Sequence, residues 1–157
     1  MAVRVGMGFD VHAYSDDPAR PFVLGGVRFE GQRGLAGHSD ADVVAHAVAD
    51  ALLGAAGLGD LGDHFPDTDP AWKDADSLDL LARAVAAVTA GGWRPANVDC
   101  TVVLEAPRLA PHRAAMQERL TVAVGAPVTV KATTAEGLGS IGRGEGVACW
   151  AVALVEA

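Results

Sequence analysis

The sequence has few cysteines, no long hydrophobic run and no excess of basic residues. Two cysteines, Cys100 and Cys149, are too few for a disulfide scaffold, and each lies in an apolar segment typical of a small core residue. No apolar run approaches the roughly 18–20 residues that a membrane-spanning helix needs. Twelve basic residues against 20 acidic ones give a net charge of −8, the opposite of a nucleic-acid binder. We therefore expect neither a membrane nor a nucleic acid among its partners.

Internal repeats, low-complexity linkers and a signal-peptide pattern are also absent. The first ten residues contain no long apolar segment and no cleavage-site pattern, so we expect no secretory signal. Half of the 157 residues are hydrophobic, which is enough for a core and argues against disorder. These features predict a cytoplasmic protein with a single domain over residues 1–157.

Glycine, proline and helix-capping residues divide the chain into short elements. A hairpin is expected around Gly25-Gly26, between residues 22–24 and 27–29. Ser39 or Asp40 is a good N-cap for a helix that Gly57 ends. Further helices are predicted over 77–90 and 111–124, strands over 3–9 (continuing to His12), 97–104, 128–133 and 147–155, and loops over 57–70 and 135–146.

This order predicts an α/β (α+β) sandwich with helices on one face of a mixed, ferredoxin-like four-stranded sheet, plus the small N-terminal hairpin. The last strand is apolar at every position from Val147 to Val155. A strand with one face in water should alternate, and three helices cover only one face of such a sheet. We therefore expect the other face to be buried against further subunits.

Two short polar patterns suggest a metal site. Asp10 and His12 are two residues apart at a strand end, so their side chains share one face, and both types bind zinc. Asp42, His46 and Asp50 form a polar stripe on the next helix, where His46 is placed to add a third ligand and Asp50 to orient it. A chance Asp-x-His pair and a solvated helix face are the alternatives.

Several other segments could bind phosphate or a second ion. His38-Ser39-Asp40 stands at a helix start, where free amide groups suit a phosphate, although simple N-capping explains it as well. The acidic loop 59–70 is long enough to be functional, or is a plain acidic turn. Thr133, Thr134 and Glu136 could bind phosphate with magnesium, Glu105 to Arg108 offer a basic group at a strand end, and Arg143 with Glu145 suggests an ion pair or an anion site. The residues indicate a metal-assisted enzyme that acts on a phosphorylated substrate, but their spacing does not identify that substrate.

The motifs taken together resemble one family over essentially the whole chain, the 2-C-methyl-D-erythritol 2,4-cyclodiphosphate synthases of the non-mevalonate isoprenoid pathway. The matching stretches are Gly8-Phe9-Asp10-Val11-His12, Gly25-Gly26-Val27, 38–42 with His46, 50–55, 59–70, 97–99, Ala106-Pro107, Pro111-His112, Lys131-Ala132-Thr133-Thr134, Glu136, Leu138-Gly139 and 142–146. Each piece is common, but their joint occurrence in this order is specific.

The resemblance implies a phosphorus–oxygen lyase reaction. The 2-phosphate of 4-diphosphocytidyl-2-C-methyl-D-erythritol 2-phosphate attacks the β-phosphorus, CMP leaves, and a cyclic diphosphate closes. It implies zinc on Asp10, His12 and His46, one ion per subunit, and magnesium or manganese on Glu136. His38 and Thr134 would stabilise the transition state.

The resemblance also assigns substrate-binding residues. Asp10, His12, His38 and Ser39 would bind phosphate and sugar-chain groups. The methylerythritol pocket would comprise Asp60, Gly62, Phe65, Pro66, Asp67, Thr68 and Asp69. The cytidine pocket would comprise Leu104, Glu105, Ala106, Pro107, Arg108, Leu109, Ala110, Ala132, Thr133 and Thr134, followed by Ala135 and Glu136.

The family forms homotrimers with active sites between neighbouring subunits, and Arg143 would face a phosphate in the cavity on the trimer axis. Three positions depart from the common pattern. Ser140 stands where many members have Phe, which argues against the isoprenoid diphosphate that some members hold there. Arg108 replaces a common Lys, and Ala135 replaces a polar residue beside Glu136.

Overall fold

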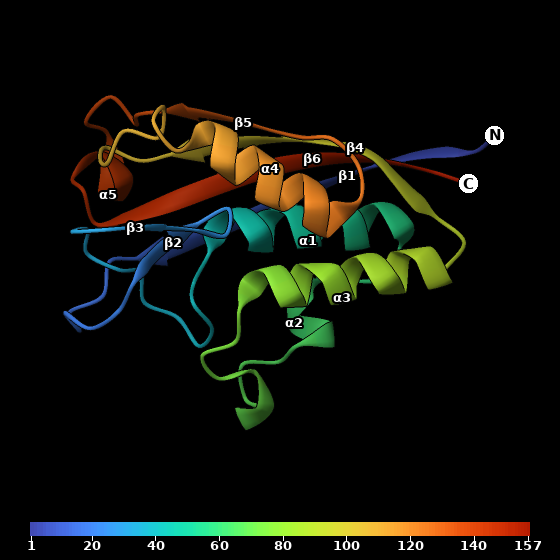
Figure 1. Ribbon diagram of the computed structural model, residues 1–157, viewed down its shortest axis with the longest axis horizontal. Coiled ribbons are helices and arrows are strands. Elements are labelled where there is room, and N and C mark those ends of the chain that lie inside the picture. The colour runs from blue at the N-terminus through green and yellow to red at the C-terminus, as the bar shows by residue number, and fades with distance from the viewer.

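Four strands form one mixed sheet in the order β1-β6-β4-β5 (Figure 1). The computed structural model describes all residues, 1–157. The strands are β1 (Val3–Ala13), β4 (Arg94–Val103), β5 (Val128–Thr133) and β6 (Gly146–Glu156). β6 runs antiparallel to both β1 and β4, whereas β4 and β5 are parallel. The mixed four-stranded sheet is as predicted.

The expected ferredoxin-like arrangement is wrong. That arrangement requires the order β-α-β-β-α-β, whereas the main elements here follow the order β-α-α-β-α-β-β. The reason is the parallel pair: β5 returns beside β4 through a crossover helix, and the last strand then inserts between β1 and β4.

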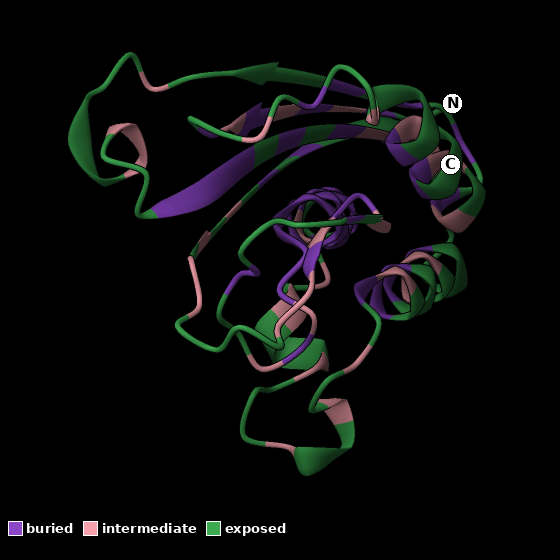
Figure 2. Cartoon of the chain, turned by 60° about the vertical axis from the view of Figure 1, so that its left-hand side comes forward, coloured by how far each residue is buried: buried purple, intermediate pink, exposed green.

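Three long helices cover one face of the sheet. α1 (Val43–Ala56) lies against β1 and β6, α4 (Arg113–Val124) lies against β5, and α3 (Ser77–Ala90) contacts both helices. Figure 2 shows α1 in the middle of the molecule, buried along its length, and 12 of its residues are buried. Its apolar and small side chains on all sides suit a helix that is enclosed by a sheet and by other helices. No helix combines the length and the apolar character needed to cross a membrane.

Glycine on β1 allows α1 to approach the sheet closely. A Cβ atom on Gly8 would lie 1.9 Å from the carbonyl oxygen of Ala47, and one on Gly6 would lie 2.0 Å from that of Ala51. No side chain fits there, so the helix backbone rests directly on the strand. This close approach brings the end of β1 next to the first turn of α1, where His46 lies.

α1 starts later than predicted, because Asp42, not Ser39 or Asp40, is its N-cap. Asp42 is fully buried, and its Oδ1 accepts hydrogen bonds from the amides of Val44 and Ala45, each at 3.1 Å. Ala41 has a left-handed φ of 59°, so no helix could begin before it. Asp42 is therefore a cap rather than part of a solvated stripe.

The smaller elements also correct the sequence reading. The hairpin β2 (Phe22–Leu24) and β3 (Val27–Phe29) is confirmed. The predicted loops contain two short helices, α2 (Leu61–His64) and α5 (Gly139–Gly142), and a 3₁₀ turn (Pro70–Trp72) follows the first loop. A capping box between Asp60 and Asp63 stabilises the short helix α2.

Two element boundaries also differ from the prediction. Pro111 precedes α4 instead of lying in its first turn. β4 begins at Arg94 and has a bulge between Pro95 and Asn97.

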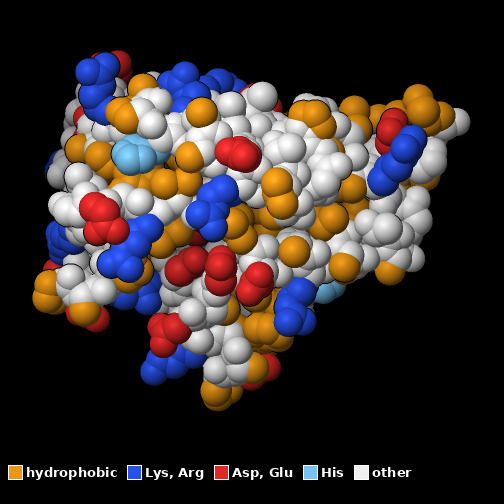
Figure 3. Space-filling view, viewed as in Figure 1, with side chains coloured by type: hydrophobic (Ala, Val, Ile, Leu, Met, Phe, Trp, Pro, Cys, Tyr) orange, Lys and Arg blue, Asp and Glu red, His pale blue; other side chains and the backbone are white.

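The face of the sheet away from the helices is apolar and exposed on β1 and β6. Val5 and Met7 are each 66% exposed in the single chain. The other large apolar side chains exposed on these two strands are Val3, Phe9, Val11, Trp150 and Val152. Monomeric proteins rarely leave a continuous apolar patch of this kind in water. The side of the molecule on which α3 and α4 lie in Figure 1 instead carries interspersed acidic and basic side chains (Figure 3).

Candidate metal centre and adjoining pocket

Asp10, His12 and His46 form one cluster. One ligand atom from each lies within 4.8 Å of the others. Asp10 Oδ2 is the meeting point, at 3.1 Å from His12 Nε2 and 3.0 Å from His46 Nδ1. The prediction that Asp10 and His12 share one face of a strand, and that His46 joins them from the next helix, is confirmed.

The surroundings of His12 fit a metal ligand. Its Nδ1 lies 2.7 Å from the carbonyl oxygen of Ala36. A carbonyl only accepts, so Nδ1 carries the proton and Nε2 presents a lone pair toward Asp10. Two acceptors that face each other repel unless a cation lies between them. Tetrahedral zinc with bonds of about 2.0–2.1 Å would set its ligands about 3.3 Å apart, close to the spacing seen here.

In the absence of a metal a proton can take the cation's place, and the titration of the cluster reflects this. Burial alone would raise the pKa of Asp10, but hydrogen bonds and charge from His12 and His46 outweigh it and lower the pKa from 3.8 to about 2. Burial alone would lower the pKa of His12, but its hydrogen bond and attraction to Asp10 raise the pKa above 6.5. The cluster is therefore a strong site for positive charge.

His46 is held on its other side by two serines rather than by Asp50. His46 Nε2 lies 2.7 Å from Ser77 Oγ and 3.2 Å from Ser39 Oγ. The expected role of Asp50 in orienting His46 is wrong, because Asp50 Oδ1 instead accepts from the amide of Leu61 at 2.7 Å. Asp50 therefore fixes the start of α2.

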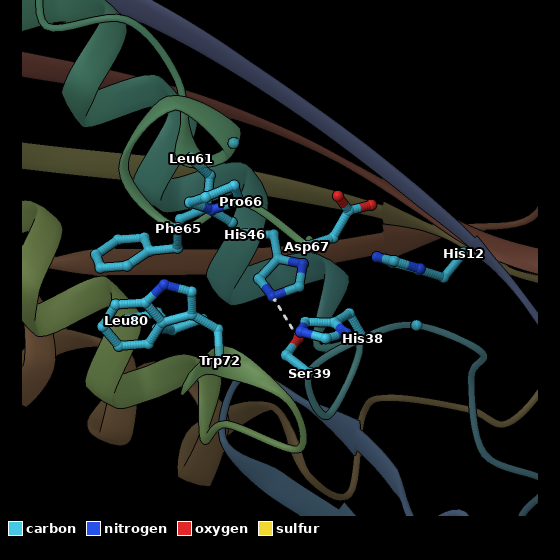
Figure 4. A pocket seen from close by; sticks show the side chains of 12 residues that line it. His12, His38, Ser39, His46, Leu61, Phe65, Pro66, Asp67, Trp72 and Leu80 are labelled. Atoms are coloured by element: carbon cyan, nitrogen blue, oxygen red, sulfur yellow. Dashed lines mark hydrogen bonds between the residues drawn. The ribbon is translucent and has the colours of Figure 1, made fainter. Parts of the chain in front are cut away.

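A hollow of about 430 Å³ opens beside the cluster (Figure 4). His12 reaches it from β1 and His46 from α1, while aromatic side chains enter from the segment between α1 and α3. Its lining also contains residues that the sequence did not single out: Gly37, Leu61, Trp72 and Leu80. The substrate-binding candidates that line it are His12, His38, Ser39, Gly62, Phe65, Pro66 and Asp67.

The remaining candidates of this segment have local structural contacts. Asp60 Oδ1 accepts from the amide of Asp63 at 2.9 Å and caps α2. Asp69 caps the 3₁₀ turn, and its carbonyl oxygen lies 3.1 Å from His38 Nε2. Thr68 is exposed beside them and does not line the hollow.

The start of α1 does not offer the free amides expected beside His38-Ser39-Asp40. The amides of Val44 and Ala45 already donate to Asp42, as do those of Gly25 and Gly26 at 2.9 and 2.7 Å. A phosphate would therefore meet the side chains of His38 and Ser39 rather than a helix terminus.

A second hollow of about 290 Å³ lies at the ends of β4 and β5. Glu105 Oε1 accepts from the amide of Ala135 at 2.8 Å and ties its two loops together. Tyr14 donates its hydroxyl to the carbonyl of Ala106 at 2.8 Å. Arg113 is a lining residue that the sequence reading missed. The candidates that line the hollow are Leu104, Glu105, Pro107, Arg108, Leu109, Ala110, Ala132, Thr133 and Thr134.

Two further candidates lie apart from both hollows. Glu136 follows β5 in an exposed turn with a left-handed φ of 53°, and its amide donates to Thr134 Oγ1 at 3.2 Å. Such a conformation costs energy in a residue other than glycine, and residues that adopt it are enriched at functional sites. Arg143 ends α5 and donates to Glu145 at 2.6 Å, which is the predicted ion pair.

The two hollows lie at opposite edges of the sheet but at the same end of it. His12 pairs with Val147, and Val103 pairs with both Ala148 and Thr133, so these residues are nearly level. β1 and β5 are the two edge strands. Three strand spacings of about 4.8 Å put the edges about 14 Å apart.

Comparison with known proteins places the chain in a family. The model of the YgbB family matches residues 3–156. The chain is 56% identical over 157 residues to a 2-C-methyl-D-erythritol 2,4-cyclodiphosphate synthase of Salinibacter ruber, covering 98% of this chain and 99% of that one. It is 55% identical over 154 residues to the synthase of Symbiobacterium thermophilum, covering 96% and 97%.

Solved structures agree with this. A synthase structure described as the CDP-bound form superimposes with a TM-score of 0.87 at 36% identity, covering 98% of this chain and all of that one. A bifunctional enzyme of Campylobacter jejuni superimposes with a TM-score of 0.92 at 41% identity, and there the match spans 98% of this chain but only 42% of the other. With a family model that matches nearly every residue, and with relatives of this identity over their whole length, the chain belongs to the YgbB family.

Proposed function

We propose that this enzyme converts 4-diphosphocytidyl-2-C-methyl-D-erythritol 2-phosphate into 2-C-methyl-D-erythritol 2,4-cyclodiphosphate and CMP, in isoprenoid precursor biosynthesis and in the cytoplasm. An oxygen of the 2-phosphate bonds to the β-phosphorus, and the bond from that phosphorus to the bridging oxygen breaks, so that CMP leaves. The observation that carries the proposal is the coincidence of full-length family membership with a three-ligand cluster that opens into a pocket.

Asp10, His12 and His46 are the residues that would hold a zinc ion. Three protein ligands beside an open pocket are typical of a catalytic rather than a structural zinc site. When bound, the ion supplies positive charge and Lewis acidity for a phosphate oxygen. Burial, together with hydrogen bonds that orient the distal ring nitrogens, keeps both imidazoles fixed for this purpose.

The other residues of the first hollow position the substrate. An intramolecular attack depends mainly on holding the chain folded back on itself, and phosphoryl transfer needs charge neutralisation rather than a protein nucleophile. His38, held by the carbonyl of Asp69, is placed to meet a phosphate. Gly62 and the segment from Phe65 to Asp69 would enclose the methylerythritol chain, and Asp60 would bind its hydroxyl groups.

The second hollow would bind the cytidine diphosphate part. Its mixed lining of apolar side chains, Arg108 and Arg113 suits a base and a phosphate. Thr134 would stabilise charge on the reacting phosphates. Glu136, projecting from the adjoining strained turn, would hold magnesium or manganese that arrives with the substrate.

We extend the proposal to a homotrimer with active sites between copies. Two half-sites at opposite edges of one sheet would come together when β1 of one copy approaches β5 of the next. The exposed apolar face of β1 and β6 would be buried by the same association. Arg143, paired with Glu145 at that end of the sheet, would face a phosphate near the trimer axis.

The test is phosphorus NMR of the protein with the diphosphocytidyl substrate, zinc and magnesium. We expect CMP and a cyclic diphosphate to appear together, in equal amounts, and to stop appearing when a chelator removes the metals. Release of inorganic phosphate would instead identify a zinc hydrolase, whose nucleophile is a metal-bound water. An unchanged spectrum with metal and nucleotide bound would identify a binding module and overturn the proposal.

A further inference from the structure

Ser77 links the metal cluster to a partly buried carboxylate, that of Asp40, which has no assigned role. Ser77 is the first residue of α3 and is 1% exposed. Its Oγ lies 2.7 Å from His46 Nε2 on one side and contacts Asp40 Oδ1 on the other. Its amide donates to Asp40 Oδ2 at 3.1 Å. His46, Ser77 and Asp40 thus form a continuous chain of hydrogen bonds that leads away from the metal site.

The chemistry of the three groups fixes the direction of this chain. An ionised carboxylate only accepts, so the hydroxyl proton of Ser77 goes to Asp40. The lone pairs of Ser77 Oγ are then left to accept. Of its two possible donors, His46 Nε2 at 2.7 Å is much closer than Ser39 Oγ at 3.4 Å, which assigns the donated proton to His46 Nε2. With a cation between His46 and Asp10, the proton of the neutral imidazole is then on Nε2, and Nδ1, 3.0 Å from Asp10 Oδ2, presents its lone pair to that cation.

We propose that Ser77, backed by Asp40, is a positioning residue that fixes the tautomer and orientation of His46 for metal binding. The inference rests on the proposed metal site. It gives His46 the same arrangement as His12, whose Nδ1 proton goes to the carbonyl of Ala36. Both rings then direct an unprotonated nitrogen to the same point, as metal-bound histidines oriented by a second hydrogen bond do.

The neighbouring polar groups do not take this role. Ser39 Oγ is farther from His46 Nε2, at 3.2 Å, and also accepts from the amide of Ala41 at 3.3 Å. Asp50 is engaged with Leu61. Asp40, in contrast, accepts from Ser77 with both oxygens, and its Oδ1 also accepts from the amide of Asp42 at 3.1 Å. It thereby joins the starts of α1 and α3 beneath the metal ligand.

The test measures zinc affinity by competition with a chromophoric chelator, which requires no turnover. We expect Ser77→Ala to weaken zinc binding by about 10- to 100-fold. Ser77→Thr, which keeps the hydroxyl, should restore most of the affinity. The matched control is Asp76→Ala, which removes the neighbouring N-cap bond to the amide of Leu78 without touching His46. That variant should lose stability but bind zinc as the parent does.

A second measurement needs no variant. Nitrogen-15 NMR of the zinc-bound parent should show the proton of His46 on Nε2 and the metal on Nδ1. A proton on Nδ1, or a Ser77→Ala variant that binds zinc as tightly as the parent, would overturn the inference. An equal loss of affinity in Asp76→Ala would do the same. If His46→Ala also kept full zinc affinity, the metal site itself would fail, and the two failures are thereby distinguished.

Discussion

The two faces of β1 differ as much as any two regions of the molecule. On one face, Gly6 and Gly8 allow α1 to rest on the strand, and Asp10 and His12 follow at the same two-residue interval. On the other face, Val3, Val5, Met7, Phe9 and Val11 are exposed apolar side chains. One strand thus carries close packing and a charged site on its inner side and an exposed apolar surface on its outer side.

The difference shows how the site depends on backbone contact. The polar side chains of the cluster lie where the backbones of β1 and α1 are in direct contact. This contact fixes the position of His46 relative to Asp10. The apolar side chains of the outer face need no defined contact geometry, because the hydrophobic effect is not directional. Changes to the inner face should therefore be far more disruptive than changes to the outer one.

The largest effect should come from filling the glycine contact. We expect Gly8→Val to leave no stably folded protein, because its Cβ would lie 1.9 Å from the carbonyl of Ala47 and would push α1 away. Gly54→Ala is the control, since a Cβ there meets nothing within 4 Å, and alanine in a helix should add up to about 1 kcal/mol of stability. Urea unfolding measures both. A folded Gly8→Val protein of parental stability would contradict the packing argument.

Next in size should be the removal of a metal ligand. His46→Ala or Asp10→Ala should abolish zinc retention and turnover while the protein stays folded and assembled, because two remaining ligands do not hold the ion. Metal content after dialysis and the rate of CMP release measure this. His64→Ala is the matched control, because its ring is exposed and bonds only to the carbonyl of Leu58. Full activity in either ligand variant would refute the site.

Charge on the outer face should change assembly without unfolding the chain. We expect Met7→Asp to reduce the sedimenting mass from that of an oligomer to that of one chain, because an aspartate cannot be buried unpaired in an apolar interface. Val122→Asp on α4, where the side chain is 80% exposed on the opposite layer, should leave the mass unchanged. An intact oligomer with Met7→Asp would place the interface elsewhere.

The smallest effect should be the pH dependence of the metal-free protein. The lowered pKa of Asp10 adds stability that is present above pH 3.8 and is lost as the pH falls toward about 2. The raised pKa of His12 adds stability that is present below pH 6.5 and is lost as the pH rises through that raised value. Urea midpoints should therefore be highest between these limits.

The control for this prediction is His12→Gln, which should remove the loss on the alkaline side. Zinc should reverse the trend, because the ion competes with protons for the same nitrogens. A metal-free parent whose stability rises steadily from pH 6 to 9 would contradict the assignment.

Local sequence signals located most of the elements. Apolar runs predicted the strands, and the Gly-Gly pair predicted the hairpin. The two-residue period of a strand predicted that Asp10 and His12 share one face. Errors came where long-range contacts override local preference. Ser39 and Asp40 look like N-caps, but they are used in contacts with His46 and Ser77, and Asp42 caps the helix instead.

The alternation of strands and helices, the pairing of Asp10 with His12 and, through the joint occurrence of the motifs, the family can all be read from the order of the residues. These depend on short-range periodicity and on residue order. The strand order, the insertion of β6 between β1 and β4, and the contact of Ser77 with a histidine 31 residues away arise from the three-dimensional packing and have no local signal. Such contacts arise when distant segments are buried together, and buried polar groups must then find whichever partners the packing brings within reach.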